Sequence, residues 1–156
     1  MTTTAFEKIK SFLDANSVEY EFKEHEPVRT SEQAAAVRGE DIKIGAKALL
    51  LKVDKDFILA VVSAAKRIDS KAFKKALGIR SLRFATGDEV KVKTGCVPGG
   101  VPPFAHVFGL KLVVDKSVLE NEYMAFNAGE QTKSLKMKTQ DYVRLLNPRV
   151  EEFSAD

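Results

Sequence analysis

Two apolar segments near the middle of the chain constrain the fold most strongly. Residues 46–53 read AKALLLKV and residues 57–63 read FILAVVS, and only Asp54, Lys55 and Asp56 separate them. Apolar segments of this length with so short a polar connection predict two antiparallel strands. Nearly continuous apolar runs are typical of strands that are buried on both faces. We therefore expect this hairpin to form the middle of a sheet.

Helical and strand patterns alternate along the rest of the chain. Thr4 and Thr30 each stand three residues before a Glu or Gln, which predicts a helix to about Ala15 and a second helix over Ser31–Arg38 that Gly39 ends. The remaining predictions are strands over 18–22, 81–85, 110–115 and 122–127, and helices over 68–77, 86–94 and 139–146. This mixed order predicts an α/β fold of the mixed α+β kind, with a mixed sheet.

The length and composition are those of one soluble domain. The chain has 156 residues, of which 44% are hydrophobic and 30% are charged, so we expect a single domain over residues 1–156. Cys96 is the only cysteine, which excludes an internal disulfide and a thiolate metal site. No segment approaches the ~20 apolar residues of a membrane span. These observations predict a cytoplasmic protein that has no metal and does not interact with a membrane.

The charge pattern favours a local contact with a polyanion. The chain has 25 basic and 22 acidic side chains and a net charge of +3. A protein that binds duplex DNA usually has a more concentrated basic stripe, so we expect no DNA partner. We interpret Lys71, Lys74 and Lys75 as the solvated face of one helix. If RNA is the partner, the contact should lie at one end of the molecule.

A segment rich in glycine and proline interrupts the regular elements. Residues 96–104 read CVPGGVPPF. Prolines remove backbone donors and glycines permit positive φ, so we expect a shaped loop. Backbone N–H groups of such a loop can bind a carbonyl oxygen, and the alternative is an ordinary rigid turn.

Lys47 is unusual because it stands at the edge of a strongly apolar strand. An ammonium group is costly to bury unless it faces a polar cleft or an anionic ligand. A functional lysine is one interpretation. The other is that the methylene stem covers the core while the charged end reaches water.

These features together resemble the YbaK and prolyl-tRNA-synthetase-associated (ProX-like) editing-domain family over nearly the whole chain. The order and spacing of the matching segments carry the resemblance, above all the isolated strand lysine followed by the glycine-proline loop. The matching segments are 25–27 (HEP), the alanine-rich helix, Lys47, 67–69 (RID), Gly95, 97–104 (VPGGVPPF), 113–115 (VVD) and 126–129 (FNAG).

The resemblance implies a curved, partly barrel-like mixed sheet flanked by helices, and a deacylase that acts in trans on misacylated tRNA. The substrate would be alanyl- or cysteinyl-tRNA for proline, with its 3′ acceptor end bound and prolyl-tRNA synthetase as a second partner. The substrate's own 2′-hydroxyl would assist the attack, so neither a side-chain base nor a cofactor is expected. Lys47 would hold the carbonyl or the terminal phosphate.

The resemblance also implies further site residues. Amides of Gly99, Gly100 and Val101 would serve catalysis, and the remaining substrate contacts would be Tyr20, His25, Thr30, Pro102, Pro103 and Phe104. Structural explanations compete for Tyr20, His25 and Thr30; for example, Tyr20 fits the core spacing, and Thr30 fits a helix cap. Pro102 and Ala48 depart from the residues that many family members have, which leaves the amino acid that is removed open.

Other residues favour structural interpretations. We interpret Asp115 as the end of a strand, and His106 and Cys96 as packing groups. The chain contains neither a GxSxG elbow nor a GxxxxGK[ST] loop, which disfavours a serine hydrolase and a P-loop NTPase. The alternative to an editing enzyme is a non-catalytic module of the same fold that binds tRNA or a synthetase.

Overall fold

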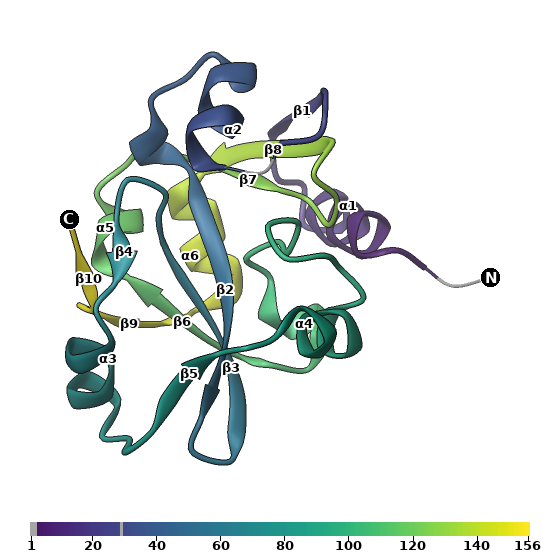
Figure 1. The fold of residues 1–156 in the computed structure, drawn as a ribbon. Helices are drawn as coiled ribbons and strands as arrows, with labels where there is room; N and C mark the ends of the chain where they lie inside the picture. The colour runs from purple at the N-terminus through teal and green to yellow at the C-terminus, as the bar shows by residue number, and fades with distance from the viewer. Residues whose placement is uncertain (1–2, 29) are drawn as a thin grey trace.

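The computed structural model describes residues 3–28 and 30–156 and consists of helices packed around mixed β-structure (Figure 1). The helices are α1 (Ala5–Ala15), α2 (Ser31–Arg38), η1 (Ile42–Ile44), α3 (Ser70–Leu77), α4 (Gly87–Thr94), η2 (Ala105–Phe108), α5 (Lys116–Leu119) and α6 (Thr139–Leu146). The strands are β1 (Tyr20–Glu24), β2 (Ala46–Val53), β3 (Asp56–Ser63), β4 (Arg67–Ile68), β5 (Leu82–Phe84), β6 (Lys111–Asp115), β7 (Tyr123–Asn127), β8 (Lys133–Lys138), β9 (Arg149–Glu151) and β10 (Ser154–Ala155). The prediction of a mixed α/β fold is confirmed.

The hairpin of β2 and β3 lies in the middle of a five-stranded sheet of order β5-β2-β3-β6-β9. β2 pairs antiparallel with β3 and β5, whereas β3–β6 and β6–β9 are parallel, so the sheet is mixed as predicted. A second sheet has the order β1-β8-β7. A parallel bridge between Gly45 and Ala125 joins the start of β2 to β7. The two sheets thus meet at the upper end of β2 in Figure 1.

Both faces of the central hairpin are buried because side chains alternate along a strand. Ala46, Ala48 and Leu50 of β2 belong to a cluster that includes residues of α1 and α6. Leu51 and Val53 belong to a second cluster, together with Phe73 of α3 and Phe153. The expectation of a hairpin buried on both faces is confirmed.

Threonine caps and left-handed glycines set the ends of the predicted helices. The Oγ1 atoms of Thr4, Thr30 and Thr86 accept hydrogen bonds from the backbone N–H three residues later and so cap α1, α2 and α4. Gly39, Gly78 and Gly95 have φ near +70° and end α2, α3 and α4. Each of these helices lies within a few residues of its predicted range.

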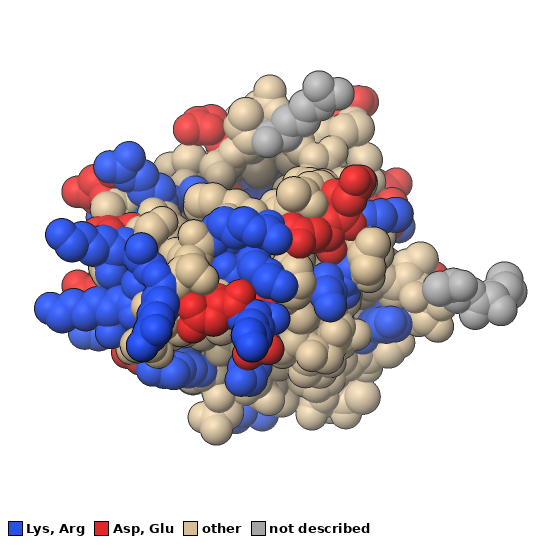
Figure 2. Space-filling view, turned by 60° about the horizontal axis from the view of Figure 1, so that its bottom comes forward, with Lys and Arg blue, Asp and Glu red and all other residues tan. Residues whose placement is uncertain are grey.

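No helix in the part of the chain that the structure describes is both long enough and apolar enough to span a membrane. On the face shown in Figure 2, Lys and Arg side chains gather mainly on the left, with Asp and Glu side chains between them.

Candidate active site

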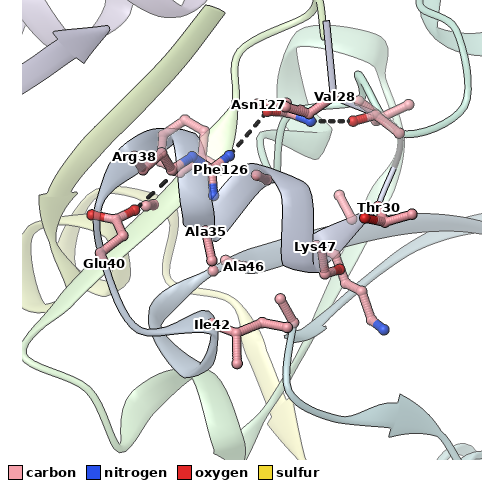
Figure 3. A pocket seen from close by; sticks show the side chains of 18 of the residues that line it. Val28, Thr30, Ala35, Arg38, Glu40, Ile42, Ala46, Lys47, Phe126 and Asn127 are labelled. Atoms are coloured by element: carbon pink, nitrogen blue, oxygen red, sulfur yellow. Dashed lines mark hydrogen bonds and ion pairs between the residues drawn. The ribbon is translucent and has the colours of Figure 1, made fainter. Parts of the chain in front are cut away.

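A cavity of about 210 Å³ lies where the two sheets meet (Figure 3). Its walls come from α2, η1, the start of β2, the end of β7 and the glycine-proline loop. Six of the lining residues are alanines, whose small side chains leave the cavity unfilled: Ala34, Ala35, Ala46, Ala48, Ala64 and Ala125. The cavity therefore exists because small side chains stand where larger ones would fill the junction, and it suits a small ligand.

Lys47 lines this cavity from the second position of β2. By strand alternation it shares a face with Leu49 and Leu51, but it stands where that face opens into the cavity. Its side chain is half-buried, and burial lowers the pKa of its ammonium, which the charge of Glu32 partly offsets. Within residues 3–28 and 30–156 its Nζ makes neither a hydrogen bond nor an ion pair. A partly desolvated, unpaired cation is suited to bind a carbonyl oxygen or an anionic group.

Gly99 and Val101 of the glycine-proline loop also line the cavity, whereas Gly100 does not. The N–H of Gly100 donates to the carbonyl oxygen of Val97 at 2.9 Å, and its own carbonyl accepts from the N–H of Gly129 at 2.8 Å. In contrast, the N–H groups of Gly99 and Val101 have no hydrogen-bond partner in the described part of the chain. Gly99 has a φ of 86°, a conformation that side-chain-bearing residues rarely adopt. The loop therefore offers two backbone donors to a ligand.

Pro102, Pro103 and Phe104 are buried and do not line the cavity. The ring of Phe104 packs edge-on against Tyr142, with ring centroids 5.5 Å apart, and also contacts Phe12, Phe126 and His106. The hydroxyl of Tyr142 donates to the carbonyl oxygen of Pro103 at 2.5 Å. These contacts place the second half of the loop in the core, where it can hold Gly99 and Val101 in position.

The three predicted substrate contacts from the N-terminal third occupy different places. Thr30 lines the cavity close to Lys47 in Figure 3, and it also caps α2. Tyr20 does not line the cavity, and its hydroxyl donates to Asp14 at 2.7 Å. His25 does not line the cavity either, but its Nε2 lies 2.7 Å from the Oγ of Ser134.

Arg38 is a feature of the cavity that the sequence analysis did not single out. This residue ends α2 and is only 7% exposed. Its Nε donates to the Oγ of Ser134 at 3.0 Å, and its Nη2 donates to the Oδ1 of Asn127 at 2.9 Å. The carboxylate of Glu40 lies 3.9 Å from Nε. Burial lowers the pKa of the guanidinium, and Glu40 acts in the opposite direction.

Asn127 connects this arginine to the glycine-proline loop. Its Oδ1 accepts from Arg38, and its Nδ2 donates to the carbonyl oxygen of Gly99 at 2.6 Å (dashed in Figure 3). One side chain thus fixes the guanidinium and the loop relative to each other. No short sequence pattern indicates this hydrogen-bond network, because Asn127 and Ser134 stand 89 and 96 residues after Arg38.

Asp115, His106 and Cys96 have packing or capping contacts. Asp115 is buried and accepts from the backbone N–H groups of Ser117 and Phe153, at 2.9 and 2.7 Å. Burial lowers the pKa of His106 and raises that of the Cys96 thiol. The neutral forms of both side chains are therefore favoured, which agrees with their interpretation as packing groups.

Metal chemistry has no obvious ligand set here. Among residues 3–28 and 30–156, no group of three or more His, Cys, Asp or Glu side chains is arranged to hold a metal ion.

Comparison with known proteins assigns the family. The model of the aminoacyl-tRNA editing domain matches residues 25–145, a range that includes α2, Lys47 and the glycine-proline loop. The chain belongs to the aminoacyl-tRNA editing domain family. The resemblance predicted from the sequence is thereby confirmed.

Curated relatives cover almost the whole of this editing-domain protein. It is 33% identical over 152 residues to the multifunctional Ser/Thr-tRNA deacylase ProXp-y of Escherichia coli K12, which covers 94% of this chain and 91% of the relative. It is 23% identical over 161 residues to the prolyl-tRNA editing protein ProX of Acetoanaerobium sticklandii, with 99% and 98% coverage.

Solved structures agree with this fold. The crystal structure of the hypothetical protein APE2540 has a TM-score of 0.86 and 25% identity, covering 95% of this chain and 99% of that chain. A candidate trans-editing enzyme for prolyl-tRNA synthetase has a TM-score of 0.84 and 22% identity, with full coverage of both chains. The second likeness supports the fold alone.

Proposed function

We propose that this protein is an aminoacyl-tRNA deacylase that acts in trans and binds the acyl group of the substrate in the alanine-lined cavity. The observation that carries the proposal is that Lys47 lines this cavity while its ammonium has no partner among residues 3–28 and 30–156. A module that only bound tRNA or a synthetase would not need a partly desolvated cation and two backbone donors, all without partners in the described part of the chain, around one cavity. The names of the relatives, a Ser/Thr-tRNA deacylase and a prolyl-tRNA editing protein, point to the same reaction class.

In this mechanism the terminal ribose stays at the cavity mouth and the acyl group enters. The 2′-hydroxyl of that ribose assists a water molecule that adds to the ester carbonyl carbon. The bond from the carbonyl carbon to the ribose oxygen then breaks. The ribose oxygen takes up the proton that the attacking water has lost, which leaves a free amino acid and intact tRNA. Lys47 and the N–H groups of Gly99 and Val101 stabilise the negative charge that develops on the carbonyl oxygen.

The size of the cavity favours small acyl groups. Alanyl- and cysteinyl-tRNA for proline are the substrates that the sequence resemblance implies, and serine and threonine are those in the name of the 33% identical relative. All four amino acids are small enough to be compatible with a cavity of about 210 Å³ lined by six alanines. Prolyl-tRNA synthetase is the partner that we propose for an editing role on tRNA for proline.

The test is deacylation of a panel of labelled aminoacyl-tRNAs carrying alanine, cysteine, serine, threonine or proline. The account predicts hydrolysis of at least one small acyl group above the spontaneous rate, together with sparing of cognate prolyl-tRNA. Tight binding of tRNA without hydrolysis of any member would favour the non-catalytic module instead.

A further inference from the structure

Resting on the proposed deacylase function, we propose that Arg38 is a specificity-determining residue. Its Nη1 donates a hydrogen bond to an oxygen on the side chain of the acyl group. The preferred acyl groups would then carry a hydroxyl, and the matched group without one would be hydrolysed more slowly.

The guanidinium is held as a fixed group. Arg38 is nine-tenths buried. Its guanidinium contacts Ser134 of β8, Asn127 of β7 and Glu40 of the loop between α2 and η1. Ser134 and Asn127 belong to neighbouring strands, β8 and β7, and are themselves buried or half-buried. A donor whose orientation is fixed before the ligand arrives discriminates better than a mobile surface arginine.

One end of the guanidinium remains for a ligand. Nε and Nη2 have the partners described above, whereas Nη1 has no hydrogen-bond acceptor within the described ranges 3–28 and 30–156. Nη1 lies close to Gly45, which also lines the cavity, since a Cβ placed on Gly45 would lie 3.8 Å from it. A guanidinium N–H at the wall of a cavity favours an oxygen partner, so a ligand oxygen in the cavity can accept from Nη1.

The relative positions of Arg38 and Lys47 separate their roles. Both side chains line the cavity, but in Figure 3 they stand on opposite sides of the view and the Lys47 side chain points away from Arg38. Lys47 is half-buried and Arg38 is deeply buried, so the ester and its ribose belong at the Lys47 end. An acyl side chain that extends past the alanines then reaches Arg38.

A neutral hydroxyl fits this end better than a carboxylate. Glu40 already faces the guanidinium, and its own side chain is only 10% exposed. A second carboxylate would have to be desolvated beside it, which is costly. A hydroxyl oxygen accepts from Nη1 without adding a charge, and the alanine walls limit the length of the chain that carries it.

The experiment compares seryl and alanyl esters on one and the same tRNA, because the two acyl groups differ by a single hydroxyl. The wild-type protein should hydrolyse the seryl ester with a kcat/KM about 10- to 100-fold higher, the range expected for one charge-assisted hydrogen bond. The double variant Arg38→Met with Glu40→Gln should reduce this ratio to within about threefold of one, because the seryl ester loses more of its rate than the alanyl ester does. Arg83→Met, which removes an exposed arginine that is also paired with a glutamate, is the control and should keep the wild-type ratio.

The outcomes separate the two proposals. A wild-type ratio near one, with both esters hydrolysed, would overturn the role of Arg38 and leave the deacylase function standing, whereas hydrolysis of neither ester would overturn both. An equal fall for both esters in the double variant would also exclude the specificity role. If that variant does not fold, Ser134→Ala decides, since it removes one support of Arg38. A lower seryl-to-alanyl ratio supports the proposal, and an unchanged ratio overturns it.

Discussion

Lys47→Met should separate activity from stability. The substitution keeps most of the apolar stem and removes only the ammonium, which is half-buried and unpaired within the described residues. Loss of one donor to a developing oxyanion typically costs about 10²- to 10³-fold in rate, or about 2.7–4 kcal/mol, and we expect a fall of this size in kcat. Because burial without a partner disfavours the charge, the free energy of unfolding should stay within about 1 kcal/mol of wild type or rise.

Lys52→Met is the matched control for this prediction. Lys52 is also half-buried and lies on the same strand, but its Nζ stands over the ring of Phe57 at 4.7 Å and not at the cavity. Its removal should leave deacylation within about twofold of wild type, as expected for a surface substitution away from the site. Single-turnover hydrolysis and thermal unfolding of both variants provide the readouts.

The pH dependence adds an independent check. Because the pKa of Lys47 is lowered, its ammonium loses its proton at a lower pH than an ordinary lysine does. Wild-type activity, corrected for spontaneous ester hydrolysis, should therefore fall on the alkaline side as the pH rises through that pKa. Lys47→Arg stays protonated and should lack this alkaline fall. Wild-type rates in Lys47→Met, or a loss of folding equal to the loss of activity, would refute the reasoning.

Three further predictions concern the loop and the scaffold. Gly100→Val should abolish most deacylation while the protein remains folded. A Cβ at this position would already lie 3.4 Å from the carbonyl oxygens of Val97 and Gly129, so the two methyl groups of valine beyond it should displace the turn that positions the neighbouring amides. Wild-type turnover would remove the loop from the site. Tyr142→Phe should lower the free energy of unfolding by about 1–3 kcal/mol in a denaturant titration, because it leaves the buried carbonyl of Pro103 without its donor, and an unchanged midpoint would contradict this. Hydrogen bonds from Arg83 in the first place, and from the backbone N–H of Thr86, lower the pKa of Glu89 from 4.5 to about 2. These contacts stabilise the fold above pH 4.5, and the stabilisation is lost as the pH falls toward 2. Glu89→Gln should flatten that part of the stability profile, and an unaltered acid profile would argue against these contacts.

Local signals were sufficient for the elements that the sequence predicted. Threonine caps, glycine ends and apolar spacing are read within a few residues, and they located α1, α2 and α4. The strand β8 lacked such a signal, since KSLKMK carries three lysines and resembles a solvated segment. It is a strand because β1 and β7 pair with it on either side, which only the tertiary fold determines.

The candidate site was accessible to sequence reasoning only in part. Lys47 and the glycine-proline loop attract attention because their residue types conflict with their surroundings. Which loop amides face the cavity depends on the turn that engages Gly100, and this geometry leaves no trace in composition. Arg38 at a helix end looks like an ordinary solvated residue, and only its distant partners show that it is buried.

The most direct test of the account is the structure of the protein with a stable amide analogue of the substrate, a 3′-deoxy-3′-(serylamino)adenosine. The account predicts the seryl group inside the alanine-lined cavity, with the carbonyl oxygen within hydrogen-bond distance of the Lys47 Nζ or the amides of Gly99 and Val101. An analogue bound elsewhere, or bound with its acyl group pointing away from Lys47, would contradict the claim that this cavity is the deacylation site.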